Sequence, residues 1–192
     1  MKMKRIEFIS VHPRKSAADL LSAVPIFSDP RYANPLTSCM AGFLASIGLE
    51  TAPVVLPEAG FLDGLMIRHG LLLIDEARLT YPGDLLHEAG HLAVVTGTQR
   101  KLLCGNAGSD PGEEMAAIAW SYAAALYLGI DPAVVFHPSG YSGGSQAILL
   151  NFSQGRYFGV PMLEWFGLTV SRRDAVLLDL PPYPHMLKWL RD

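Results

Sequence analysis

The chain has 192 residues, of which 50% are hydrophobic and 17% are charged, a balance that excludes disordered, collagen-like and low-complexity proteins. Fifteen Lys and Arg residues against eighteen Asp and Glu residues give a net charge of −3. The chain therefore has no excess of positive charge with which to hold a phosphate backbone, and nucleic acid is not an expected partner. Because this length suits one sizeable core, we predict a single domain over residues 1–192.

The cysteines and the apolar stretches indicate where the protein works. Cys39 and Cys104 are far apart and form no Cys-x-x-Cys pair, which is more typical of a reducing compartment than of a disulfide scaffold. The N-terminal residues contain no apolar core long enough for a signal peptide. Residues 115–130 form the most membrane-like stretch but fall short of the ~18 to 20 residues that span a bilayer. We expect a cytoplasmic protein; a membrane protein that uses this stretch as a span is the weaker alternative.

Apolar spacing and turn residues predict the elements of the first third of the chain. Short helices are expected over residues 16–24 and 35–47, the second with Asn34 as N-cap. A β-branched run over residues 51–56 predicts a strand, and residues 64–75 predict two strands joined by a tight turn at His69-Gly70. The second of these strands, residues 71–74, either offers an edge to an extended peptide or lies inside the sheet.

A first long helix follows the predicted hairpin. Turn residues lead into Asp84, which is the expected N-cap of a helix over residues 85–95. Gly97 is its expected C-terminal stop. This helix carries the main chemical motif of the sequence.

A longer, alanine-rich helix comes next. Asp110 is its expected N-cap, Pro111 occupies its first turn, and the helix should continue to Gly129. Further short helices are expected over residues 131–136, 144–152 and 161–166 and near the end of residues 181–192. We therefore predict an α+β protein, mainly helical, with a small sheet or hairpin before the first long helix.

The first long helix contains His87-Glu88-Ala89-Gly90-His91, the HExxH pattern. Residues four apart lie on one face of a helix, so both imidazoles can bind one metal ion. Glu88 points about 100° away from His87, which leaves its carboxylate beside the metal. There it can accept a proton from a water molecule that the metal activates. The alternative is an ordinary amphipathic helix whose histidines are satisfied by hydrogen bonds.

A catalytic zinc site usually has three protein ligands, so a third must come from elsewhere in the chain. Val94 and Gly97 stand where an extended three-histidine motif would need Gly and His, which excludes that version. The next candidates are Asp110, Glu113 and Glu114, at the start of the alanine-rich helix. Asp110 is better suited to cap that helix.

The choice between the two glutamates depends on helical phase. Glu114 shares a face with small and apolar residues, whereas Glu113 lines up with Trp120, whose bulk hinders close approach of two helices. We therefore expect His87, His91 and Glu114 to bind the metal, with Glu113 as the alternative third ligand. Two imidazoles and a carboxylate suit Zn²⁺ but also iron, manganese or nickel.

At these residues the sequence resembles the gluzincin-type metalloproteases, and among them the small cytoplasmic ImmA/IrrE-like proteins. The resemblance rests on the hairpin at 65–75, the HExxH helix and Glu113-Glu114-Met-Ala-Ala-Ile-Ala, and it covers residues 64–128. It implies a minimal zincin-like domain in which two histidines and a downstream glutamate bind zinc. It also implies that the motif glutamate, Glu88, is the general base and that the substrate is a protein or peptide.

A hydrolase of this type also needs a donor for the oxyanion that forms when water attacks a carbonyl group. His137, Tyr141 and Tyr157 follow the metal-binding helices in glycine-containing regions, and the sequence does not choose among them. We therefore predict a zinc-dependent metallohydrolase acting as a peptidase, with Glu88 as its catalytic base. The alternative is a zinc-stabilised regulatory or binding protein without proteolytic activity.

Overall fold

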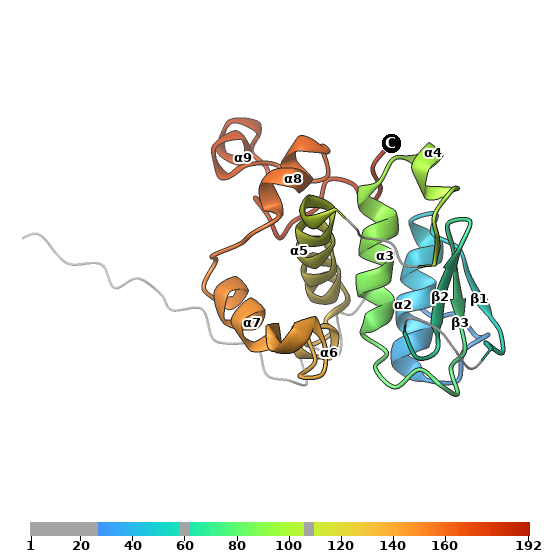
Figure 1. The fold of residues 1–192 in the computed structure, drawn as a ribbon. Coiled ribbons are helices and arrows are strands. Elements are labelled where there is room, and N and C mark those ends of the chain that lie inside the picture. The colour runs from blue at the N-terminus through green and yellow to red at the C-terminus, as the bar shows by residue number, and fades with distance from the viewer. Residues whose placement is uncertain (1–26, 58–61, 106–109) are drawn as a thin grey trace, which may run out of the picture.

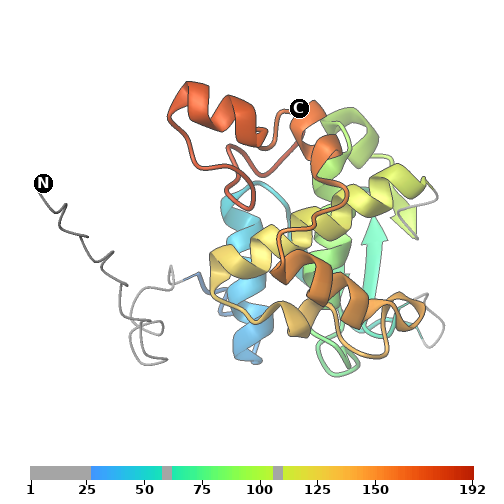
Figure 2. The ribbon, with the colours of Figure 1, turned by 90° about the vertical axis from the view of Figure 1, so that its left-hand side faces the viewer.

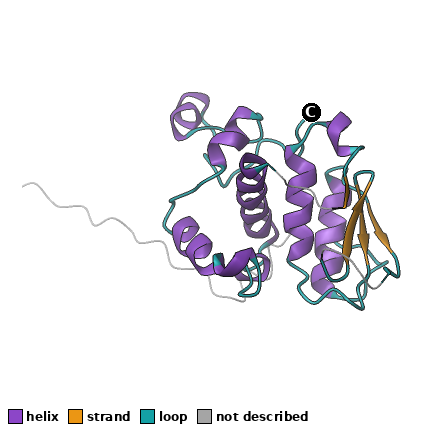
Figure 3. Cartoon of the chain, in the orientation of Figure 1, coloured by secondary structure: helices purple, strands orange, loops and turns teal. Residues whose placement is uncertain are grey.

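The structure is a computed structural model that describes residues 27–57, 62–105 and 110–192. Within these ranges the chain forms eight α-helices, one short 3-10 helix and a four-stranded sheet. Figure 1 shows the sheet on one side, α2 and α3 beside it, and α5 between these helices and the smaller C-terminal helices. Figure 3 shows how far helix outweighs strand. The predicted α+β class is therefore confirmed.

The strands form a mixed sheet of order β1-β3-β2-β4. Its members are β1 (Thr51–Pro53), β2 (Leu65–Arg68), β3 (Leu71–Ile74) and β4 (Cys104–Gly105). β2 and β3 pair antiparallel as the predicted hairpin, and the turn residues His69 and Gly70 have φ of 52° and 77°, the sign that a type I′ turn requires. β3 pairs with β1 on its other side. It lies inside the sheet, so the alternative of a free peptide-binding edge there is wrong.

α2 (Pro35–Ser46) begins as the sequence predicts. The Asn34 side chain accepts hydrogen bonds from the backbone N–H groups of Leu36 and Thr37, which satisfies two of the unpaired donors of the first turn. The strand expected over residues 51–56 is limited to β1. The helix expected over residues 16–24 lies outside the described residues.

α3 (Asp84–Val94) is the predicted motif helix, but both of its ends differ from the prediction. Gly83, not Asp84, is the N-cap, and a Cβ on Gly83 would lie 2.0 Å from the carbonyl oxygen of Val134. The Asp84 carboxylate instead pairs with His137 across the chain. Gly97 is not a helix stop either, because Thr96 caps a new short helix, α4 (Gly97–Arg100), with a capping box.

α5 (Pro111–Leu128) follows the prediction at both ends. Asp110 accepts hydrogen bonds from the backbone N–H groups of Gly112 and Glu113, and the C-cap Gly129 has φ of 67°, a left-handed conformation that glycine adopts without strain. No helix in the described ranges is long and apolar enough to cross a membrane.

The C-terminal third holds four α-helices and an irregular tail. They are α6 (Pro132–Val135), α7 (Ser145–Ser153), α8 (Val160–Trp165) and α9 (Arg172–Leu178). The first three match the predicted helices within a residue or two, while α9, capped by Ser171, was not predicted. The prediction of a helix near the end of residues 181–192 is wrong, because the backbone N–H groups of Leu187 and Arg191 donate to the carbonyl groups of Leu168 and Ala93, outside this segment.

α3 and α5 approach each other closely through small residues, and Figure 2 shows α5 passing across α3. A Cβ on Gly90 would lie 2.8 Å from the carbonyl oxygen of Ala117, closer than a carbon atom approaches an oxygen without displacing it. Trp120, three residues further along α5, is fully buried and packs on Phe43 and Trp189. Gly90 therefore sets the distance between the two helices.

Substituting Gly90 tests this packing. Alanine is the better helix former by roughly 1 kcal/mol, yet we expect Gly90→Ala to lower the free energy of unfolding by about 1 to 3 kcal/mol, because its methyl group would overpack the crossing. Urea denaturation followed by circular dichroism measures the change. Gly97→Ala is the matched control, since a Cβ at that helical glycine meets nothing within 4 Å. A Gly90→Ala protein as stable as the wild type would contradict this role.

Candidate metal centre

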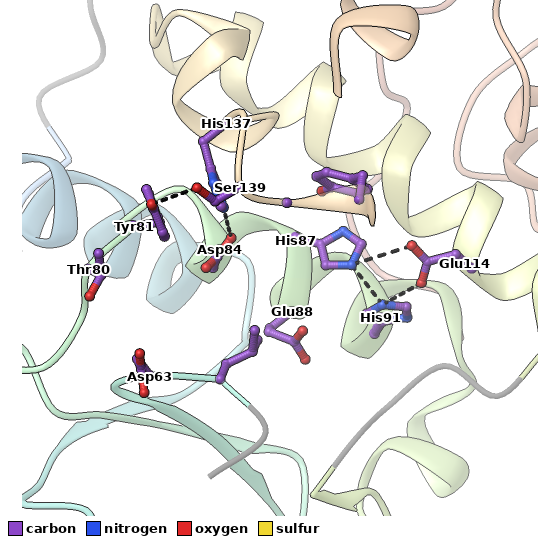
Figure 4. A pocket seen from close by; sticks show the side chains of 13 residues that line it. Asp63, Thr80, Tyr81, Asp84, His87, Glu88, His91, Glu114, His137 and Ser139 are labelled. Carbon is purple, nitrogen blue, oxygen red and sulfur yellow. Dashed lines mark hydrogen bonds and ion pairs between the residues drawn. The ribbon is translucent and has the colours of Figure 1, made fainter. Parts of the chain in front are cut away.

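Three side chains from two helices converge where α3 and α5 cross (Figure 4). The Nε2 atoms of His87 and His91 are 3.1 Å apart. The Glu114 carboxylate lies 3.6 Å from Nε2 of His87 and 3.1 Å from Nε2 of His91. His91 is buried and Glu114 is partly exposed. Two nitrogen atoms and a carboxylate are therefore brought together at the edge of the buried core.

These distances fit a single bound ion. Ligand atoms at about 2.0 Å from a tetrahedral zinc ion lie about 3.3 Å from one another, and the three observed separations scatter around that value. Nitrogen and carboxylate oxygen donors are those that divalent transition metals accept. His87, Glu88 and His91 also form a group whose ligand atoms all lie within 4.8 Å of one another. The site could therefore hold a metal ion.

The protonation states of the ligands favour this reading. Burial, and then the neighbouring His91, lower the pKa of His87 to about 4, so its imidazole is neutral at pH 7. The hydrogen bond with His91 lowers the pKa of Glu114 below its usual range, against an opposing effect of burial. A neutral imidazole and an ionised carboxylate are the forms that bind metal.

Glu88 is on the same helix but in a different position relative to the ligands. Figure 4 shows its carboxyl group to one side of the two imidazoles, and the side chain is buried. Burial raises its pKa to about 7. A carboxyl group with that pKa can gain and lose a proton near neutral pH, which is the property of a general base.

Asp110 and Glu113, the other two candidate ligands on this part of the chain, do not lie beside the histidines. Among the described residues it is Glu114, not Glu113, that contacts the two histidines. Asp110 caps α5 through hydrogen bonds to two backbone N–H groups. The structure therefore places Glu114 beside the two histidines and Asp110 at the start of the helix.

A pocket of about 680 Å³ opens over these residues. Its walls come from α3, the start of α5, the loop before α3 and the loop after α6. Besides the three residues at the crossing and Glu88, the lining residues are Leu62, Asp63, Thr80, Tyr81, Asp84, His137, Ser139, Gly140 and Tyr141. The pocket therefore gives a bound molecule access to the two histidines and Glu114.

Two of the three candidate oxyanion donors reach this pocket. The Tyr141 ring lies 5.1 Å from the His87 ring, edge to face, and its hydroxyl group is buried without a hydrogen-bond partner among the described residues. Burial raises the pKa of Tyr141 well above its usual value, so the hydroxyl keeps its proton. Tyr157 is not in the pocket lining; it packs against Phe152 and Tyr183.

His137 joins the pocket wall to the start of α3. Its Nε2 atom lies 2.9 Å from an Asp84 carboxylate oxygen, and its ring stacks on Tyr81 with centroids 3.8 Å apart. Tyr81 is in turn hydrogen-bonded to Ser139. The sequence does not reveal this cluster, because Tyr81 and Asp84 are more than fifty positions from His137 and Ser139 and no motif connects the two pairs.

Comparisons with protein-family models, with curated proteins and with solved structures found no match to this chain. What the site can do therefore follows from its own residues.

Removing the Glu114 carboxylate tests whether it is a ligand. We expect wild-type protein to bind about one zinc ion per chain, and Glu114→Ala to bind it at least about tenfold more weakly. Zinc affinity measured by competition with a chromophoric chelator gives this ratio. Glu113→Ala is the matched control, with the same loss of charge one residue away. Loss of affinity in the Glu113 variant alone would make Glu113 the third ligand.

The raised pKa of Glu88 predicts how the metal-free protein responds to pH. Its pKa is 4.5 in the unfolded chain and about 7 in the folded one, so its contribution to stability is lost as the pH rises from about 4.5 to about 7. At 1.36 kcal/mol per pKa unit, the buried carboxylate costs about 3 kcal/mol at pH 8.

We therefore expect Glu88→Gln to stabilise the metal-free protein at pH 8 by roughly this amount and to leave it nearly unchanged at pH 4. Urea unfolding in the presence of a chelator at both pH values measures the difference. Acid titration of His87 affects both proteins equally and cancels. An equal effect of the substitution at the two pH values would show that the buried charge is not its cause.

Proposed function

We propose that the chain is a zinc-dependent metallohydrolase acting as a peptidase, with His87, His91 and Glu114 as zinc ligands and Glu88 as general base. One observation carries the proposal: the two imidazole Nε2 atoms are 3.1 Å apart and each lies 3.1 to 3.6 Å from one oxygen of the Glu114 carboxylate, in a pocket that also holds the buried Glu88 carboxyl group. The resemblance of the HExxH helix and the following glutamate-bearing helix to gluzincin-type and ImmA/IrrE-like proteases supports the same reading.

Each residue has a separate part in hydrolysis. Zinc held by His87, His91 and Glu114 would lower the pKa of a water molecule to near neutrality and polarise a carbonyl group. Glu88 accepts the proton of the attacking water, since its pKa of about 7 suits proton transfer at neutral pH. The same carboxyl group then returns the proton to the leaving amine nitrogen. His87, His91 and Glu114 would hold the zinc ion in a fixed position beside Glu88.

Tyr141 is suited to stabilise the oxyanion. Its hydroxyl group keeps its proton, has no partner among the residues described and belongs to the pocket lining. Its backbone is left-handed, with φ of 54°, a conformation uncommon for a residue other than glycine and frequent at functional sites. A hydroxyl group that forms its hydrogen bond only as charge develops on the substrate lowers the barrier to reaction.

Two substitutions test this assignment. We expect Glu88→Gln to lower kcat at least about 10²-fold, because no base remains for the attacking water, and Tyr141→Phe to lower it about 10²-fold, because the oxyanion loses one donor. The substrate is a library of peptides derived from a whole proteome, incubated with the zinc-loaded protein, with new termini identified by mass spectrometry. Rates are then measured on the peptides that the library identifies.

Zinc content is the control for both variants and should equal that of the wild type, since neither residue is a proposed ligand. Full peptidase activity in Glu88→Gln would overturn the mechanism. A wild-type protein that cleaves no peptide, but whose melting temperature falls when zinc is removed, would instead be a zinc-stabilised binding protein.

A further inference from the structure

The pocket over the candidate metal centre has acidic walls. Besides Glu88 and Glu114 it is lined by Asp63 and Asp84, and no Lys or Arg is among the described residues that line it. A ligand that carries negative charge thus meets no Lys or Arg side chain among the described residues that line the pocket.

Asp63 stands apart from the reaction centre. It lies just before β2, is exposed, and Figure 4 shows it on the side of the pocket away from His91 and Glu114. No ion pair joins it to any other residue that the structure describes. Its exposed carboxylate can therefore be reached by a ligand in the pocket.

An aromatic ring belongs to the same pocket. Tyr81 stacks one face of its ring on His137 and remains about one third exposed. Carboxylates together with an aromatic ring are the groups with which proteins hold the ammonium group of Lys and the guanidinium group of Arg. Asp84, paired with His137, adds a further carboxylate to the wall.

The absence of basic side chains also bears on which peptide bond is cut. A peptidase that removes C-terminal residues must hold a free carboxylate, which calls for a positive partner such as Arg. The lining of this pocket supplies none among the residues described. A bond inside a chain has no such requirement.

We propose that this pocket selects peptide segments with a Lys or Arg side chain near the bond to be cut, and that Asp63 is the residue that recognises this cation. The inference rests on the proposed peptidase function and names its substrate class. It makes Asp63 a specificity-determining residue, separate from the residues that hold the metal or transfer protons.

Binding of two peptides tests the proposal. They are capped at both ends and identical except for a central Lys or a central Glu, and their affinities for the zinc-loaded Glu88→Gln protein are measured by calorimetry. We expect the Lys peptide to bind at least about tenfold more tightly at low ionic strength, with the ratio falling as salt is added. Asp63→Asn should bring the ratio close to one.

Asp179→Asn is the matched control, because it removes the same charge from an exposed residue at the end of α9, outside the pocket. It should leave the preference for the Lys peptide unchanged. Equal or undetectable binding of the two peptides, tighter binding of the Glu peptide, or the same ratio in the Asp63 and Asp179 variants would overturn the proposal.

Cleavage of the same peptides by the wild type separates this proposal from the proposed function. If the wild type binds the Lys peptide selectively but cleaves neither peptide, the selectivity stands and the peptidase assignment fails. If it cleaves both peptides at equal rates, the peptidase assignment stands and the cation selectivity fails.

Discussion

The close crossing of α3 and α5 depends on a position that has no side chain. A Cβ on Gly90 would approach the Ala117 carbonyl oxygen to 2.8 Å, so glycine alone allows the two backbones this near. Glu114 precedes Ala117 by one helical turn, and His87 and His91 flank Gly90 on α3. The contact that joins the two helices therefore also brings the Glu114 carboxylate to the two imidazoles. A wider crossing would leave two histidines without their third partner.

The rest of the pocket is built onto the same pair of helices. After α5 ends, α6 packs on the start of α3, where Gly83 leaves room for the carbonyl group of Val134. His137 then pairs with Asp84 on α3, and four residues later Tyr141 lies against His87. The loop that carries the proposed oxyanion donor is thus attached to the helix that carries the ligands. The candidate metal ligands and the proposed oxyanion donor are therefore positioned by the same pair of helices.

Burial shifts the pKa values of His87 and Glu88 in opposite directions, and both shifts favour the neutral form of the side chain. It lowers the pKa of His87 to about 4 and raises that of Glu88 to about 7, because a buried group loses the hydration of its charge. A neutral imidazole keeps a lone pair for a metal, and a carboxyl group poised near pH 7 can move a proton. Two adjacent residues of α3 thus have the protonation properties of a metal ligand and of a general base, which suits the proposed hydrolase.

Features made by residues close together in the chain could be predicted from the sequence. The caps at Asn34 and Asp110, the turn at His69-Gly70 and the shared face of the two motif histidines all follow from residues a few positions apart, and these predictions are confirmed. The choice of Glu114 over Glu113 also followed from helical phase. Three features could not be predicted from the sequence and are seen only in the folded structure. Asp84 pairs with His137, β3 lies inside the sheet, and Asp63 and Tyr141 line the same pocket. Those outcomes depend on contacts between segments far apart in the chain, whose distances are set by packing and not by local periodicity.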